Sequence, residues 1–166
     1  MKVLLTTTRK PLSRLIRWGL GEPASHMAFV FDSEIVIHSY FTGLRIDSYN
    51  DFVSDQQIKK ILNIGIDKKS ESNIKKNLLK SIGTKAYDYG AILYYAWRVL
   101  LKKLFNMSIP KKNKWQSSEA YLCTEIVKYL PDSIRPEVDY EITGPYTLYT
   151  LIKEKLTDDH EIDLEE

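Results

Sequence analysis

The sequence predicts a single α+β domain in which an antiparallel β-sheet packs against helices. Three observations support this class. Residues 1–66 hold several short runs rich in Val, Ile, Leu and Thr, separated by turn-forming residues, which is typical of antiparallel strands. From Ser70 onward, apolar residues instead recur at helical spacing. A length of 166 residues, 43% of them hydrophobic and 28% charged, suffices for one core and is short for two.

The N-terminal half is expected to hold five strands and one helix. Pro11 suits the start of the helix, and Gly19 and Gly21 end it. The three residues Asp32-Ser33-Glu34 form a turn between two strands, which makes those strands a hairpin. The strands are expected at Lys2–Thr7, Ser25–Phe31, Ile35–Tyr40, Leu44–Ile46 and Ile58–Ile66.

The C-terminal half is expected to be helical. Its second helix has apolar residues on one side and basic residues on the other, which suits packing on a core or lying on a membrane surface. The helices are expected at Ser72–Ile82, Tyr89–Phe105, a segment within Ser117–Leu130, and Gly144 to about Lys155. We assign residues 1–156 to the domain and residues 157–166 to an acidic, flexible tail.

The net charge of +2 conceals an uneven distribution. The tail holds six acidic residues and no Lys or Arg, so the domain itself is near +8. This excess suits contact with an anionic surface such as cell wall or lipid head groups, but a solvated surface is the more ordinary explanation. Nucleic acid is not expected as a partner, because the sequence holds no nucleic-acid-binding motif.

The longest apolar run near either terminus is Val3-Leu4-Leu5, which is too short for a signal peptide or a membrane span. We therefore expect a cytoplasmic protein, with delivery outside the cell by another route left open.

The chain has one cysteine, Cys123, and three histidines. A single cysteine forms neither an internal disulfide nor a multi-cysteine metal site, so it is either a small core residue or a nucleophile. Thiol catalysis needs a base to take the proton of the thiol. His160 lies in the acidic tail and is discarded as that base, which leaves His26 and His38 on the hairpin.

The length of the hairpin turn decides how these two histidines are placed. A three-residue turn pairs Phe31 with Ile35, and therefore places His38 opposite Ala28. Both histidines then point to one face as diagonal neighbours, with β-carbons roughly 5.5–8 Å apart. A two-residue turn would send them to opposite faces. On one face, they form either a base with its orienting partner or a hydrogen-bonded packing pair.

Cys123 is expected close to the start of a helix that continues through Ile126, Val127 and Leu130. At such a position the free N–H groups and the helix dipole favour the thiolate, so the pKa of Cys123 is expected to be low. The N–H of Cys123 can also bind an oxyanion. The alternative is a structural cysteine inside a helix that begins at Ser118.

Several segments, in a fixed order, resemble the circularly permuted branch of the NlpC/P60 superfamily of papain-like thiol hydrolases. Members of that branch carry a Ser-His strand first and a Cys-Ser/Thr-Glu helix late. The matching segments span about residues 3–130 and are LLTTTRKPLSRLIR (4–17), ASHMAFV (24–30), VIHS (36–39), GLRI (43–46), AYDY (86–89) and YLCTEIV (121–127).

The resemblance implies a papain-like fold in which the histidine strand precedes the cysteine helix. It assigns the nucleophile to Cys123, the base to His26 and the third polar position to His38. Many relatives carry an acid or amide at that third position, so the role of His38 is the least defined. Tyr87 falls in a Tyr-Asp stretch typical of the branch, where it either lines the substrate cleft or packs in the core.

The chemistry implied is acyl transfer through Cys123, and the commonest activity of the superfamily is cleavage of amide bonds in cell-wall peptides. A lipid-acting acyl hydrolase or acyltransferase is the first alternative. A non-enzymatic binding module on the same fold, for example in a phage or surface assembly, is the second. Neither a metal nor an organic cofactor is implied.

Overall fold

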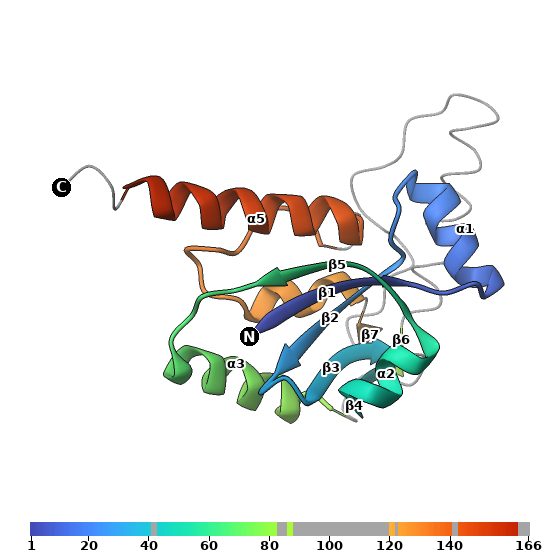
Figure 1. Cartoon of the computed structure of the whole chain (residues 1–166), viewed down its shortest axis with the longest axis horizontal. Coiled ribbons are helices and arrows are strands. Elements are labelled where there is room, and N and C mark those ends of the chain that lie inside the picture. The colour runs from blue at the N-terminus through green and yellow to red at the C-terminus, as the bar shows by residue number, and fades with distance from the viewer. Residues whose placement is uncertain (41–42, 83–85, 88–119, 122, 141–142, 163–166) are drawn as a thin grey trace.

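Five strands form one antiparallel sheet in the order β4-β3-β2-β1-β5 (Figure 1). The computed structural model describes residues 1–40, 43–82, 86–87, 120–121, 123–140 and 143–162. The sheet strands are β1 (Lys2–Thr7), β2 (His26–Phe31), β3 (Ile35–Tyr40), β4 (Gly43–Ser48) and β5 (Gln57–Asn63). The helices are α1 (Pro11–Leu20), α2 (Tyr49–Asp55), α3 (Lys68–Lys80), the 3₁₀ helix η1 (Cys123–Tyr129) and α5 (Pro145–Ile162). The expected α+β class with an antiparallel sheet is confirmed.

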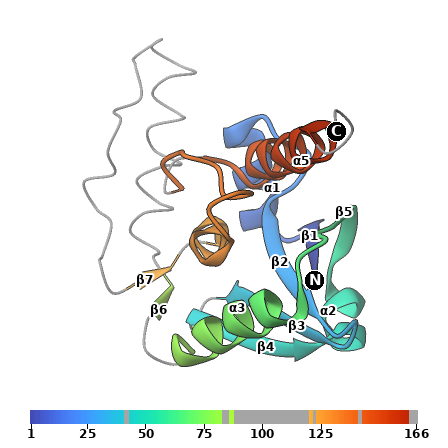
Figure 2. The ribbon, with the colours of Figure 1, turned by 90° about the vertical axis from the view of Figure 1, so that its left-hand side faces the viewer.

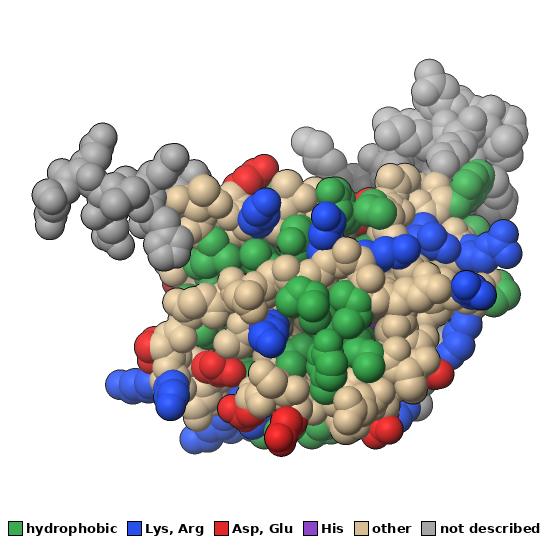
Figure 3. All heavy atoms as spheres, viewed as in Figure 1, with side chains coloured by type: hydrophobic (Ala, Val, Ile, Leu, Met, Phe, Trp, Pro, Cys, Tyr) green, Lys and Arg blue, Asp and Glu red, His purple; other side chains and the backbone are tan. Residues whose placement is uncertain are grey.

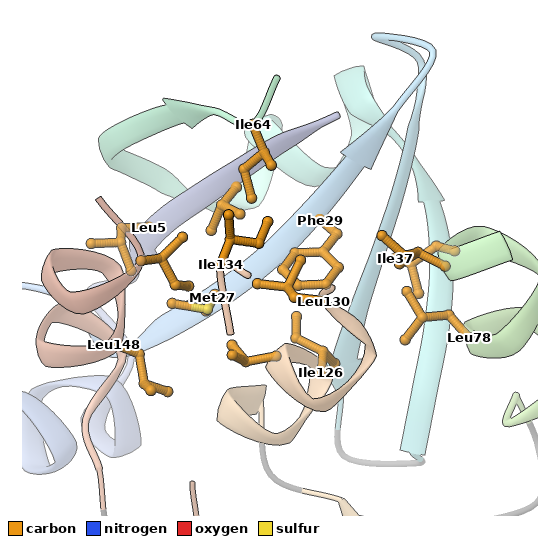
Figure 4. Close-up of a cluster of buried hydrophobic side chains, with 14 of the residues drawn as sticks. Leu5, Met27, Phe29, Ile37, Ile64, Leu78, Ile126, Leu130, Ile134 and Leu148 are labelled. Atoms are coloured by element: carbon orange, nitrogen blue, oxygen red, sulfur yellow. The ribbon is translucent and has the colours of Figure 1, made fainter. Parts of the chain in front are cut away.

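Helices cover both faces of the sheet, but unequally (Figure 2). Alternate side chains of β1, β2 and β3 point to the face that carries η1, α3 and α5, and build the main core there (Figure 4). Members of this core include Leu5, Met27, Phe29, Ile37, Ile126 and Leu148. The opposite face is smaller: Leu4, Ala28, Val30 and Val36 pack beneath Phe52 of α2. Burial on both faces explains the nearly continuous apolar runs of these strands.

Helix α2 was not expected from the sequence. Its N-cap is Ser48, whose hydroxyl accepts a hydrogen bond from the Asp51 N–H at 3.1 Å. Phe52 is its only buried residue, so the segment lacks the repeating apolar positions that predict an amphipathic helix. The cap signal was present in the sequence, but the periodicity was not.

The hairpin has the odd-length connection that the histidine placement required. Asp32 and Ser33 adopt positive φ angles of 53° and 62°, and the Glu34 N–H donates to the Phe31 carbonyl at 3.1 Å. Phe31 pairs with Ile35, and the ladder runs as far as Ala28 opposite His38. Both strands extend beyond that last pair, since β2 begins at His26 and β3 ends at Tyr40. The described ladder between the two strands thus ends two residues after His26.

The segment around Cys123 distinguishes a helix that starts near Cys123 from one that starts at Ser118. Ala120–Tyr121 form a short strand, β7, paired in parallel with β6 (Ala86–Tyr87), and η1 begins only at Cys123. A helix starting at Ser118 is therefore wrong, and Cys123 is the first residue of its helix. The helix and loop expected between Tyr89 and Lys114 lie outside the described residues.

Helix α5 is longer than expected and continues through Ile162, beyond Lys155. Its first turn is capped by Glu22, which accepts hydrogen bonds from the N–H groups of Tyr146 at 2.9 Å and Thr147 at 3.1 Å. This contact joins the loop before β2 to the C-terminal part of the chain. No helix in the described ranges is long and apolar enough to span a membrane.

Candidate active site

Three polar side chains on adjacent strands form a hydrogen-bonded chain. His26 Nε2 on β2 lies 3.1 Å from His38 Nδ1 on β3. His38 Nε2 lies 2.9 Å from Asp47 Oδ2 on β4. The two expected histidines are therefore brought together, and a carboxylate that the sequence analysis did not identify completes the chain.

The strand register places all three groups on the α2 face of the sheet. Ala28 is opposite His38 across β2 and β3, so His26 is a diagonal neighbour of His38 on the same face. Val36 is opposite Asp47 across β3 and β4, which gives Asp47 the same diagonal relation to His38. Asp47 was within reach of the sequence analysis, because β3 and β4 are separated by only residues 41–42 and the same parity argument applies.

The carboxylate determines where the protons of the chain sit. Asp47 is held by Arg45, whose Nε donates to Oδ1 at 2.6 Å, and an ionised carboxylate only accepts hydrogen bonds. His38 then donates through Nε2 and can accept from His26 at Nδ1, while a hydrogen bond with the Ser39 backbone also acts on this ring. His26 in turn donates through Nε2, which leaves the unshared pair on its Nδ1. The side chains thus hold a neutral His26 with Nδ1 unprotonated.

Desolvation keeps both imidazoles neutral, with His38 buried and His26 half-buried. Desolvation, together with a smaller effect of electrostatic repulsion with His38, lowers the pKa of His26 to about 3. The pKa of His38 is also lowered by burial, an effect that the hydrogen bond and charge of Asp47 partly oppose. Phe52 contributes to this environment, since its ring centroid lies 4.8 Å from that of His38 and 6.3 Å from that of His26. At neutral pH the pair is uncharged.

The Cys123 thiol lies against the backbone at the start of β2. Backbone N–H groups of Met27, Cys123 and Thr124 make hydrogen bonds that favour the thiolate. The Met27 amide follows His26 directly, at the point where β2 and β3 no longer pair. Among the described residues no hydrogen bond joins the thiol to an imidazole. The thiol therefore contacts the backbone beside His26, while η1 packs on the sheet face opposite to the one that carries the imidazoles.

The thiol is nonetheless protonated at rest. Its side chain is 8% exposed, and burial raises the pKa of Cys123 to about 11, more than the three backbone hydrogen bonds lower it. The negative charge of Glu125 acts in the same direction as burial. The expectation of a low pKa at a helix start is wrong for this reason: desolvation exceeds the stabilisation that the N–H groups give to the thiolate.

A cluster of buried hydroxyls supports the strand that carries His26. Ser13 Oγ of α1 lies 2.6 Å from Ser25 Oγ and 3.0 Å from Thr7 Oγ1, and it accepts from the Thr8 N–H at 3.0 Å. Ser25 also donates to Thr7 at 3.3 Å. Because Ser25 directly precedes His26, this network ties α1 and the end of β1 to the base. Sequence periodicity gave no signal for it, since it depends on three separate segments.

The remaining expected site residue is Tyr87. It pairs with Tyr121 across β6 and β7, so its backbone is near the segment that leads into Cys123. Its side chain lies outside the described part of the structure, and its role as a substrate contact stays a prediction. Within the described ranges, no group of three or more His, Cys, Asp and Glu side chains is arranged to hold a metal ion.

The chain was also compared with known proteins. No protein-family model matches the chain, and no curated protein matches it at a significant level of similarity.

Proposed function

We propose that the protein is a thiol hydrolase of papain-like, circularly permuted NlpC/P60 type, with Cys123 as nucleophile and His26 as base. The observation that supports this most directly is the Asp47–His38–His26 chain, which leaves the unshared pair of His26 on Nδ1. A packing pair of histidines would not need a carboxylate to set its protons. The Met27 amide, next to the base, is in contact with the only thiol of the chain.

The reaction has two acyl-transfer steps. His26 Nδ1 takes the thiol proton while Sγ bonds to the substrate carbonyl carbon, giving a tetrahedral oxyanion. The carbon–nitrogen bond of an amide then breaks, and the imidazolium returns the proton to the leaving amine. Water attacks the resulting thioester with His26 again taking a proton, and the acid leaves as the thiol is restored. His38 and Asp47 hold His26 in the required tautomer in both steps.

The neutral resting state distinguishes this mechanism from one based on a preformed ion pair. With the pKa of Cys123 raised to about 11 and that of His26 lowered to about 3, proton transfer and attack must occur together. The thiolate forms only as the substrate carbonyl approaches. Such coupling leaves little thiolate in the free enzyme.

Cell-wall peptide amides are the proposed substrate class, in line with the basic domain and the commonest activity of the family that the sequence resembles. A lipid-acting acyl hydrolase is the second candidate, and one observation favours it. Ile58 on β5 and His26 on β2 are both paired with Thr6 of β1, so the three lie in a row on one face. Ile58 is 36% exposed and sits about 10 Å from His26 by strand spacing, where an apolar group could rest.

Acyl-enzyme formation tests the proposal. The protein is mixed with p-nitrophenyl acetate and with a synthetic cell-wall tetrapeptide, and nitrophenol release, peptide cleavage and the intact mass are followed. We expect one acetyl group on Cys123 in the wild type, none in Cys123→Ser, and acylation slowed about 10²–10⁴-fold in His26→Ala. His160→Ala is the matched control and should behave as wild type. Equal acylation of wild type and His26→Ala would refute the base assignment.

A further inference from the structure

Helix α1 presents an apolar and basic outer surface. Leu15 is 42% exposed and Trp18 48% exposed, whereas most large apolar residues of the sheet are buried. Arg14 is exposed on the same helix. No acidic residue occurs between Thr8 and Gly21. Exposed Trp and Leu beside Arg are the features of helices that lie in the interface of a bilayer.

Exposed cations lie near the start of this helix. Arg9 and Lys10 precede it, and Lys59 and Lys60 are exposed on β5. Those two lysines lie beside the end of β1 that leads into Arg9, because Lys60 pairs with Leu5 and the next pair is Ile58 with Thr6. Figure 3 shows Lys and Arg side chains gathered on the side of the molecule where α1 lies. The acidic side chain facing this group is Asp55, which is exposed and 3.7 Å from Lys10.

We infer that the outer face of α1, with Leu15, Trp18 and the cations Arg9, Lys10 and Arg14, docks on the surface of an anionic phospholipid bilayer. The cations meet the negative head groups, and the two apolar side chains enter the acyl boundary. Nucleic acid would use the cations equally well but offers no apolar layer for Leu15. A bilayer therefore accounts for both properties of the surface.

The docking surface is connected to the candidate active site. Ser13 of α1 is hydrogen-bonded to Ser25, the residue before His26, so the bilayer would lie next to the strand that carries the base. If the proposed function holds, this placement fits its second candidate, the lipid-acting acyl hydrolase. The docking itself does not depend on the thiol chemistry, and Cys123→Ser protein should bind vesicles as wild type does.

Vesicle co-sedimentation of the full chain tests the inference. The probes are vesicles of pure phosphatidylcholine and of phosphatidylcholine with phosphatidylglycerol at an equal molar ratio. We expect binding to the anionic vesicles only, weakened at least tenfold in Leu15→Ser/Trp18→Ser and in Lys10→Glu/Arg14→Glu. Raising the salt concentration should weaken binding of the wild type, since it screens the charge contribution. Quenching of tryptophan fluorescence by brominated lipid should fall when Trp18→Phe is introduced.

Helix α3 offers a matched control. It carries Leu79, 41% exposed, between the exposed Lys76 and Lys80, and lies at the opposite end of the molecule from α1 (Figure 1). Lys76→Glu/Leu79→Ser/Lys80→Glu should bind vesicles as wild type does. All variants change exposed residues, and unchanged thermal unfolding shows that they fold. The inference is overturned if anionic vesicles do not bind, if the α1 variants bind equally well, if the α3 variant loses as much affinity, or if duplex RNA binds while vesicles do not.

Discussion

His38 Nε2 lies 2.9 Å from Asp47 Oδ2, which connects the imidazole pair to a carboxylate on the next strand. A histidine at the third position of a thiol hydrolase would orient the base only through a neutral ring. Here the ring itself is oriented by a charge. His38 thereby links Asp47 to His26, and the Asp47 carboxylate determines which ring nitrogens of the two histidines carry protons.

Replacing this carboxylate by an amide should impair the base without removing a contact. In Asp47→Asn the amide can donate to His38 Nε2, which reverses the tautomers and places a proton on His26 Nδ1. We expect acylation of Cys123 to fall by about 10²–10⁴-fold, in the range found when a triad carboxylate is changed to an amide. The measurement is the acylation rate by stopped-flow release of nitrophenol. Asp55→Asn, an exposed carboxylate at the end of α2, is the control and should leave the rate unchanged.

The buried neutral histidines predict a loss of stability in acid. The pKa of each is lower in the folded than in the unfolded chain, so the unfolded chain binds more protons once the pH falls below the ordinary value of 6.5. Stability is therefore complete above that pH and declines as the pH decreases, for His26 down to about 3. Each withheld proton lowers the free energy of unfolding by about 1.4 kcal/mol per pH unit.

Urea unfolding between pH 7.5 and 4.5 measures this decline. The decline should be shallower in His26→Gln than in wild type, because one of the two protons no longer contributes, while other carboxylates contribute equally to both proteins. Parallel curves for the two proteins would show that His26 is not held neutral by the fold.

Alkylation should report a raised thiol pKa. In the folded protein, the rate of reaction of Cys123 with iodoacetamide is expected to keep rising with pH beyond 10, since burial raises the pKa of Cys123 to about 11. In urea the same thiol should titrate near the free value of about 8.5. A reaction rate that is already at its plateau at neutral pH would instead indicate a stable thiolate–imidazolium pair.

Glu22 should stabilise the protein through α5. Besides two backbone N–H groups it accepts a hydrogen bond from the Thr147 hydroxyl at 2.6 Å. Glu22→Ala is expected to lower the free energy of unfolding by about 1–2 kcal/mol, because it removes an N-terminal cap and a favourable charge at the helix dipole. Denaturant unfolding gives the value, and Glu154→Ala, exposed within α5, is the control.

Gly144 provides a second test of the same contact. A β-carbon at this position would lie 2.2 Å from Glu22 Oε1, so Gly144→Ala must displace the carboxylate. We expect it to destabilise the wild type, and to add little once Glu22 is alanine. Additive effects of the two substitutions would mean that the glycine is needed for another reason.

Local sequence signals determined much of the fold. The strands β1, β2 and β3 and the helix α1 follow from short β-rich runs, turn residues and the Pro11 and Gly21 boundaries, and the odd turn at Asp32 to Glu34 predicted the histidine pair. Such features depend on residues close together in the chain. Helix α2 was not predicted, because its single buried residue, Phe52, gives no helical periodicity in the sequence.

The site was harder to predict where it depends on distant segments or on desolvation. Asp47 has the same diagonal relation to His38 as His26 has, but the strand expected at Leu44–Ile46 ended one residue before it, whereas β4 runs through Ser48. The hydroxyl cluster of Thr7, Ser13 and Ser25 comes from three segments and follows no spacing rule. The direction of the thiol pKa was predicted wrongly because burial of Cys123 is a tertiary property, which a helix start does not reveal.

The three strands that hold His26, His38 and Asp47 are consecutive in the chain, so the base is assembled entirely within residues 26–47. Cys123 belongs to a segment that is synthesised much later. A ribosome therefore makes all three side chains of the Asp47–His38–His26 chain well before it makes Cys123. If the proposed function is right, the site is complete only once η1 docks on β2, after the last third of the chain has been made.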